Sequence, residues 1–224
     1  MIGDSTMADK PIEDNPERGW GQMLPIFFDS SVIVENHAKN GRSTRTFLAE
    51  NRWQPIVEKL KQGDYVFIQF GHNDQSKEKV DRYTPPEDYR NNLIKFITET
   101  HEKNAQPILC TSIVRRRFDE NGKFYDVHGV YPDIVREVAK EFNVPLIDMH
   151  RKSEKLIVEF GSDSSKQIFL WVEPGKYKSL PNGKQDNTHF SEFGAIKMAE
   201  LAVEGIKELK LGLENYLKQR NDIE

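Results

Sequence analysis

The sequence predicts an α/β fold built on a doubly wound parallel sheet. Five short apolar runs recur along the 224 residues, each followed by a polar or glycine-containing segment and then by a helix-period pattern. This alternation is typical of parallel strands joined by crossover helices. The three longest runs are rich in Val, Ile and Phe without clean alternation, as expected for strands covered on both faces. The predicted strands are residues 1–2, 31–35, 65–70, 107–111 and 144–147.

The spacing of apolar residues predicts the helices between these strands. The clearest helix is 86–103, where Tyr89, Leu93 and Phe96 recur at spacings of three and four after an opening Pro-Glu-Asp that suits a first helical turn. The other predicted helices are 19–28, 46–60, 132–142, 150–160 and 191–211, with a shorter apolar piece at 168–172.

Two long segments, 115–130 and 173–188, are predicted to be irregular loops, and a turn signal at 119–122 indicates a small hairpin within the first. Loops of this length in a compact fold are typically binding segments or lids. No repeat, low-complexity tract or linker interrupts the chain. We therefore expect a single domain spanning 1–224, with the start of its first strand missing.

Composition excludes two classes of partner. The 32 basic and 36 acidic residues are spread along the chain and leave a formal net charge of −4, so neither nucleic acid nor another polyanion is expected to bind. No stretch approaches the roughly 20 apolar residues of a membrane helix, so no membrane partner is expected. The densest basic cluster, Arg115-Arg116-Arg117, is interpreted as a solvated loop end. The lone Cys110 lies in an apolar run and is interpreted as a small buried hydrophobe.

Polar motifs follow three of the predicted strands and precede the final helix. Ser5 follows the first strand, Gly41 the second and Asn73 the third, while Asp186 and His189 lie before the last helix. In a parallel sheet such positions open on one edge. A serine hydroxyl needs a base to remove its proton, and the base needs a carboxylate to fix its tautomer. The spacing of Asp186 and His189 therefore predicts a catalytic triad with Ser5.

The same motifs supply candidates for an oxyanion hole. The N–H of Ser5, the N–H of Gly41 and the side-chain amide of Asn73 could stabilise the negative charge that develops at an ester carbonyl. Each residue also has an ordinary interpretation: Gly-Asp-Ser and Asn-Gly are common turns, and Asp186 could be a loop acceptor beside a surface His189.

Four further residues are candidates for substrate contacts: His72, Asp74, His128 and Trp171. Asp74 is alternatively a loop-bracing acceptor, and Trp171 is alternatively core packing. The six histidines include no His-x-x-x-His pair and no Cys/His spacing, so neither a metal nor another cofactor is predicted.

Taken in order, these motifs resemble the four signature blocks of the SGNH (GDSL) hydrolases, and the resemblance spans nearly the whole chain. Within that family, the residues of these blocks are most similar to those of rhamnogalacturonan acetylesterases and related pectin or xylan acetylesterases. The matching blocks are Gly3-Asp4-Ser5-Thr6-Met7, Gly41-Arg42-Ser43, Phe70-Gly71-His72-Asn73-Asp74 and Asp186-Asn187-Thr188-His189-Phe190. The resemblance implies a flavodoxin-like, three-layer α/β/α sandwich with a five-stranded parallel sheet.

The resemblance also implies a function. We expect a serine esterase that removes acetyl groups from plant cell-wall polysaccharide, foremost rhamnogalacturonan (pectin), through an acetyl-serine intermediate. Its partner would be an acetylated polysaccharide or oligosaccharide. Xylan or another acetylated carbohydrate is the alternative substrate. A lipase or thioesterase is disfavoured by the polar loops, and a non-catalytic carbohydrate-binding domain is disfavoured because all five catalytic positions are present. Secretion or a periplasmic location is expected, with the signal absent from this chain, and the sequence does not indicate an oligomeric state.

Overall fold

The computed structural model describes residues 1–219 of the chain. Its backbone contacts divide the chain into two compact units, each assembled from segments that are far apart in the sequence. Unit 1 comprises Met1–Ser5, His37–Ser112 and His128–Asp148, and unit 2 comprises Thr6–Asn36, Ile113–Val127 and the chain from Met149 onward. Each unit is described by itself.

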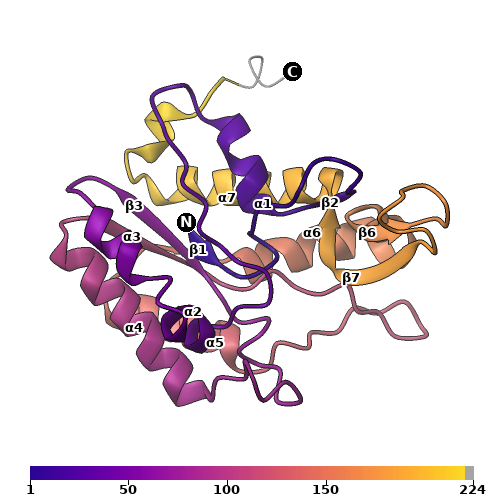
Figure 1. Cartoon of the computed structure of the whole chain (residues 1–224), viewed down its shortest axis with the longest axis horizontal. Coiled ribbons are helices and arrows are strands. Elements are labelled where there is room, and N and C mark those ends of the chain that lie inside the picture. Colours follow the sequence, from indigo (N-terminus) through magenta and orange to yellow (C-terminus); the bar gives the residue numbers. More distant parts are fainter. Residues whose placement is uncertain (220–224) are drawn as a thin grey trace. The chain divides into compact units, whose positions relative to one another are not determined.

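Unit 1 contains a four-stranded parallel sheet in the order β1-β3-β4-β5, of which Figure 1 labels β1 and β3. The two long strands are buried along all but their first residue, which agrees with the apolar runs that predicted them. The α/β class and the parallel sheet are therefore confirmed. The strands are β1 (Ile2–Gly3), β3 (Tyr65–Gln69), β4 (Gln106–Cys110) and β5 (Leu146–Ile147).

The predicted strand at 31–35 is not present, and the five-stranded sheet is not confirmed. Residues 31–35 alternate between exposed and half-buried, and the Ile33 side chain is 87% exposed, so this run lacks the cover that a central strand needs. In unit 1, the N–H groups of His37 and Lys39 instead donate to the carbonyls of Met1 and Gly3 at 2.9 and 3.0 Å. A short extended segment therefore accompanies β1, a few residues after the predicted position.

The helices of unit 1 pack around an aromatic cluster. The Phe70 ring lies 5.3 Å from Phe47 and 5.8 Å from Phe96 between ring centroids, and Phe96 also packs edge-on against Trp53. The predicted helix 46–60 is two helices, because Asn51 between them adopts a positive φ that ends the first. The helices are α2 (Thr44–Ala49), α3 (Gln54–Lys59), α4 (Pro86–Glu102) and α5 (Tyr131–Glu141), with α4 in contact with α2, α5 and β4.

Unit 2 combines helices with a small antiparallel sheet in the order β2-β7-β6 (Figure 1). Its long helix α7 (Glu192–Leu209) contacts α1, α6 and the 3₁₀ turn η1. The other helical elements are α1 (Trp20–Met23), η1 (Leu24–Phe27), α6 (Met149–Ser164), η2 (Ser165–Gln167) and η3 (Leu213–Tyr216), and the strands are β2 (Glu17–Arg18), β6 (Phe169–Val172) and β7 (Lys184–Ser191).

Strand β7 corrects the prediction that 173–188 is wholly irregular. Its residues are mostly polar and do not alternate, so they carry no strand signal of their own; pairing with the apolar β6 makes them a strand. The small hairpin predicted within 115–130 is present as a bridge between Phe118 and Phe124. None of the helices in the described part of the chain is long and apolar enough to span a bilayer.

The close approach of α7 to the backbone before β6 yields a stability prediction. A Cβ added at Gly194 would lie 1.7 Å from the carbonyl oxygen of Ile168, so Gly194→Ala must push the first turn of α7 away. Overpacking of this kind costs about 1–3 kcal/mol of unfolding free energy, measured by urea denaturation. Lys207→Ala, at an exposed position of the same helix, should change stability by less than about 0.5 kcal/mol. Equal stabilities for the two variants would contradict this packing.

Candidate active site

Ser5 lies two residues after the end of β1, a two-residue strand of the parallel sheet. Strand β1 pairs with β3 in the register Gly3 to Gln69, so the loops that follow the two strands leave the same edge of the sheet. One loop carries Ser5 and the other carries Asn73; the two side chains are only 9% and 8% exposed. The topology of unit 1 thus gathers two of the predicted site residues, as expected for an open α/β sheet.

Gly41, the other residue predicted to contribute to the oxyanion hole, precedes helix α2. Its φ of +75° favours glycine, and Ser43 two residues later caps the helix by accepting a hydrogen bond from the N–H of Thr46. The Nδ2 of Asn73 donates to the carbonyl of Arg42 at 3.0 Å, which ties this loop to the one after β3. An amide nitrogen has two hydrogens, so Asn73 retains the capacity for a second donation.

Asp186 and His189 lie in unit 2, in a bulge of β7. Phe190 pairs with Phe169 and Asp186 with Leu170, so one step along β6 spans residues 186 to 190 on β7 and the residues between them bulge out. Within the bulge, the Oδ1 of Asp186 accepts from the N–H of Thr188 at 2.7 Å and of His189 at 3.0 Å. Its Oδ2 lies 2.8 Å from the Nδ1 of His189.

This geometry controls the charge of Asp186. Burial raises the pKa of the Asp186 carboxyl, but the hydrogen bond and charge of His189, with the N–H groups of His189 and Thr188, outweigh it and hold the pKa well below its usual range. The Nζ of Lys184 lies 3.3 Å from the same carboxylate. Asp186 is therefore an anion that fixes the Nδ1 side of the imidazole and leaves the chemistry to Nε2.

Two arginines hold the bulge from outside, which the sequence interpretation missed. Arg115 Nη1 donates to the hydroxyl of Thr188 at 2.6 Å. Arg116 donates from its backbone N–H to the carbonyl of Asn187 at 2.9 Å and from Nη1 to the side-chain oxygen of Asn187 at 3.0 Å. Partial burial lowers the pKa of Arg116, against the nearby charge of Asp163. Arg115 and Arg116 are thus structural donors; their interpretation as a solvated loop end is wrong.

Trp171, predicted to contact substrate or to pack in the core, belongs to the same assembly. Its Nε1 donates to the side-chain oxygen of Asn187 at 3.0 Å. The Arg116 guanidinium and the Lys166 ammonium lie 5.1 and 5.0 Å from its ring centroid, within the range of cation–π attraction. Trp171 therefore supports the bulge through its hydrogen bond to Asn187.

The other three predicted substrate contacts are buried: His72, Asp74 and His128 are at most 3% exposed. Asp74 Oδ1 accepts hydrogen bonds from the N–H and hydroxyl of Thr44 at 2.9 and 2.6 Å, which joins the loop after β3 to the start of α2. Desolvation raises the pKa of Asp74 to about 7, although the bonds from Thr44 oppose it. These contacts match the bracing role that the sequence left open for Asp74.

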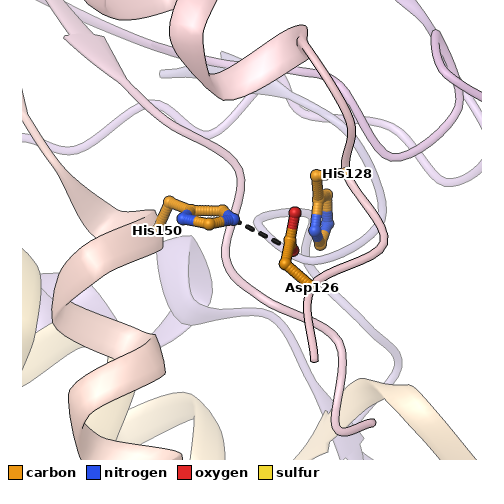
Figure 2. A group of neighbouring side chains, drawn as sticks. All are labelled: Asp126, His128 and His150. Carbon is orange, nitrogen blue, oxygen red and sulfur yellow. Dashed lines mark hydrogen bonds and ion pairs between the residues drawn. The ribbon is translucent and has the colours of Figure 1, made fainter. Parts of the chain in front are cut away.

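Unit 2 holds two features that the motifs did not indicate. His150 Nε2 lies 3.0 Å from Asp126 Oδ1 (Figure 2), and this histidine–carboxylate pair lies outside the signature blocks. A cavity of about 330 Å³ opens beside β6 and the start of α7. Its lining mixes aromatic and charged side chains, including Trp171, Tyr177, Phe193, Asp14, Arg18, Lys176 and Glu192.

The comparison with known proteins agrees with the family resemblance of the signature blocks. A model of the GDSL-like lipase/acylhydrolase family matches residues 1–194. The chain belongs to this family. Among curated acylhydrolases, rhamnogalacturonan acetylesterase RhgT of Bacillus subtilis is 44% identical over 220 residues, which cover 98% of this chain and 94% of that protein.

Solved structures resemble the chain as well. The crystal structure of protein YxiM from Bacillus subtilis has a TM-score of 0.80 at 26% identity and covers 94% of this chain, which corresponds to 56% of that one. A catalytic mutant of an acetylxylan esterase from Geobacillus stearothermophilus has a TM-score of 0.63 at 18% identity, covering 92% of this chain and 91% of that one. The second likeness shows a shared fold alone.

The burial of Asp74 yields a pH prediction. Because its pKa of about 7 in the folded protein exceeds the ordinary 3.8, the stability that Asp74 contributes is fully present below about pH 4 and is lost as the pH rises through 7. Asp74→Asn keeps an acceptor for Thr44 without an ionisable group. From pH 5 to 8 the parent should therefore lose at least about 1 kcal/mol of unfolding free energy relative to the variant. Urea denaturation at each pH measures this, and parallel pH profiles would exclude a buried, titrating Asp74.

Proposed function

We propose that this acylhydrolase is a serine esterase that removes acetyl groups from plant cell-wall polysaccharide, rhamnogalacturonan being the foremost candidate. The observation that carries the proposal is the Asp186–His189 pair, ionised and locked in a bulge, in a chain whose unit 1 presents Ser5, Gly41 and Asn73 on neighbouring loops. A carboxylate–imidazole pair of this kind prepares a general base for a serine nucleophile.

In the proposed mechanism, Ser5 Oγ attacks the carbonyl carbon of the acetyl ester while His189 Nε2 accepts the hydroxyl proton. Asp186 stabilises the resulting imidazolium through Nδ1. The oxyanion accepts hydrogen bonds from the N–H of Ser5, the N–H of Gly41 and the amide of Asn73. His189 then donates the proton to the departing sugar oxygen, leaving an acetyl-serine.

Water completes the reaction. His189 Nε2 accepts a proton from water as its oxygen attacks the acetyl-serine carbonyl, and the same donors hold the second oxyanion. Collapse of this intermediate breaks the bond to Ser5 Oγ, which recovers its proton from His189, and acetate leaves. Water supplies the oxygen of the released acid, and that acid leaves as acetate once its proton passes to solvent.

Two observations support a carbohydrate ester. RhgT, which matches this chain over nearly its full length, is named a rhamnogalacturonan acetylesterase. The cavity of unit 2 also has charged side chains beside its aromatic rings, a lining suited to sugar hydroxyls and ring faces, whereas a lipase or thioesterase would need an apolar acyl groove.

The first test of the function removes the nucleophile and the base. Ser5→Ala and His189→Ala should each reduce release of p-nitrophenol from p-nitrophenyl acetate by at least about 10³-fold, because each removes a member of one catalytic unit. Ser31→Ala and His101→Ala, at exposed positions, are the matched controls. Full activity in either active-site variant would refute the assignment.

Acetate release from acetylated rhamnogalacturonan, pectin and xylan then identifies the substrate, and release from none of them would refute the carbohydrate class.

The second test concerns the oxyanion hole. Asn73→Ala should lower kcat by about 10²–10³-fold with little change in KM, because its amide donates to a charge that exists only in the transition state. Asn91→Ala, an exposed asparagine on α4, controls for loss of an amide elsewhere. An unchanged kcat in Asn73→Ala would remove Asn73 from the mechanism and leave the nucleophile unaffected.

A further inference from the structure

We propose that His72 is a positioning residue that, through Asp4, fastens the loop carrying the nucleophile to the loop carrying the oxyanion donor. This role rests on the proposed function of Ser5 and Asn73. It replaces the expectation that His72 contacts substrate, because the His72 side chain is only 3% exposed. The proposal follows from where the two partners stand relative to the reacting groups.

His72 and Asp4 each immediately precede a residue of the proposed mechanism. Asp4 is bonded through its carbonyl to Ser5, and His72 in the same way to Asn73. The strands before them are adjacent and parallel, so the two loops begin side by side. His72 Nδ1 lies 3.1 Å from Asp4 Oδ2, and the Asp4 side chain is fully buried. One buried hydrogen bond therefore limits how far Ser5 and Asn73 can move apart.

The His72 ring is itself held on other sides. It packs edge-on against the buried ring of His128, with the centroids 5.0 Å apart and an interplanar angle of 77°. The hydroxyl of Ser76 donates to the His72 carbonyl at 3.1 Å. Because both ring and backbone are fixed, the bond to Asp4 acts as a rigid link between the loops.

The link completes a network over the three loops of unit 1 that carry Ser5, Gly41 and Asn73. Asn73 donates to the Arg42 carbonyl beside Gly41, and Asp74 accepts from Thr44 at the start of α2, so the loop after β3 is joined to the one before α2. The Asp4–His72 bond joins that pair of loops to the nucleophile. Oxyanion donors lower a barrier only if they are in place before the charge develops. Loss of this bond should therefore slow the chemical step and leave substrate binding nearly unchanged.

The test compares two substitutions of His72. His72→Phe keeps a flat ring against His128 but has no donor for Asp4, while His72→Asn places an amide nitrogen near the position of Nδ1. With p-nitrophenyl acetate, and with rates divided by the active fraction from fluorophosphonate titration, His72→Phe should lower kcat by about 10–100-fold with KM within about twofold. His72→Asn should recover most of that loss. His101→Phe, on an exposed histidine of α4, is the matched control.

The outcomes separate this inference from the proposed function. Wild-type kcat in folded His72→Phe, or equal losses in His72→Phe and His72→Asn, would overturn the positioning role even if Ser5→Ala is inactive. Full activity of Ser5→Ala would overturn the proposed function instead. If His72→Phe does not fold, Asp4→Ala and His72→Ala replace it: the kcat loss of the double variant should equal that of the more impaired single variant, because both residues act through one bond. Additive losses would overturn the link.

Discussion

The carboxylate of Asp186 is the contact on which the candidate base depends. It accepts hydrogen bonds from two backbone N–H groups and from the Nδ1 of His189, all within its own bulge. One side chain therefore both shapes the backbone and orients the imidazole. Charge-assisted hydrogen bonds of this kind are stronger than neutral ones. These three bonds also explain the low pKa of Asp186, because protonation of the carboxylate would weaken all of them. His189 is thus oriented by local chemistry before any substrate arrives.

In unit 1, buried polar side chains join loops that are far apart in the sequence. Three of its loops follow β1, follow β3 and precede α2. The side chains of Asp4, His72 and Asp74 join these loops, and the desolvation of Asp74 raises its pKa. Apolar side chains of equal volume would avoid this cost in desolvation free energy, but they would leave the loops free to adopt several arrangements. Hydrogen bonds have direction, and a network of them specifies one arrangement.

The parts that could be predicted from the sequence are those whose forces are local or repetitive. Helix α4 and strand β3 carry long apolar patterns, and Asp186 and His189 lie three residues apart, so their pairing needs no knowledge of the fold. Strand β7 could not be predicted, because its polar residues become a strand only beside β6.

Partners distant in the chain left no sequence signal either. Arg115 finds Thr188 at a separation of 73 residues, and nothing in the arginine run indicates that contact. His72 and Asp74 stand in a polar segment that resembles an exposed loop, and only the packing of neighbouring strands and helices reveals their burial. The reacting groups named from the sequence thus stay a prediction, and of the residues that brace their loops only Asp74 was among the candidates for that role.

The bulge of β7 also bears on which parts of unit 2 can change independently of one another. Because the hydrogen bonds around Asp186 close within a few consecutive residues, the candidate base and its orienting carboxylate form one short segment of the chain. The connection between β6 and β7 spans residues 173–183 and takes no part in those bonds, while Lys176 and Tyr177 from it line the cavity of unit 2. Under the proposed function, a change of length or sequence in that connection would therefore alter the lining of the cavity without breaking the hydrogen bonds that orient His189.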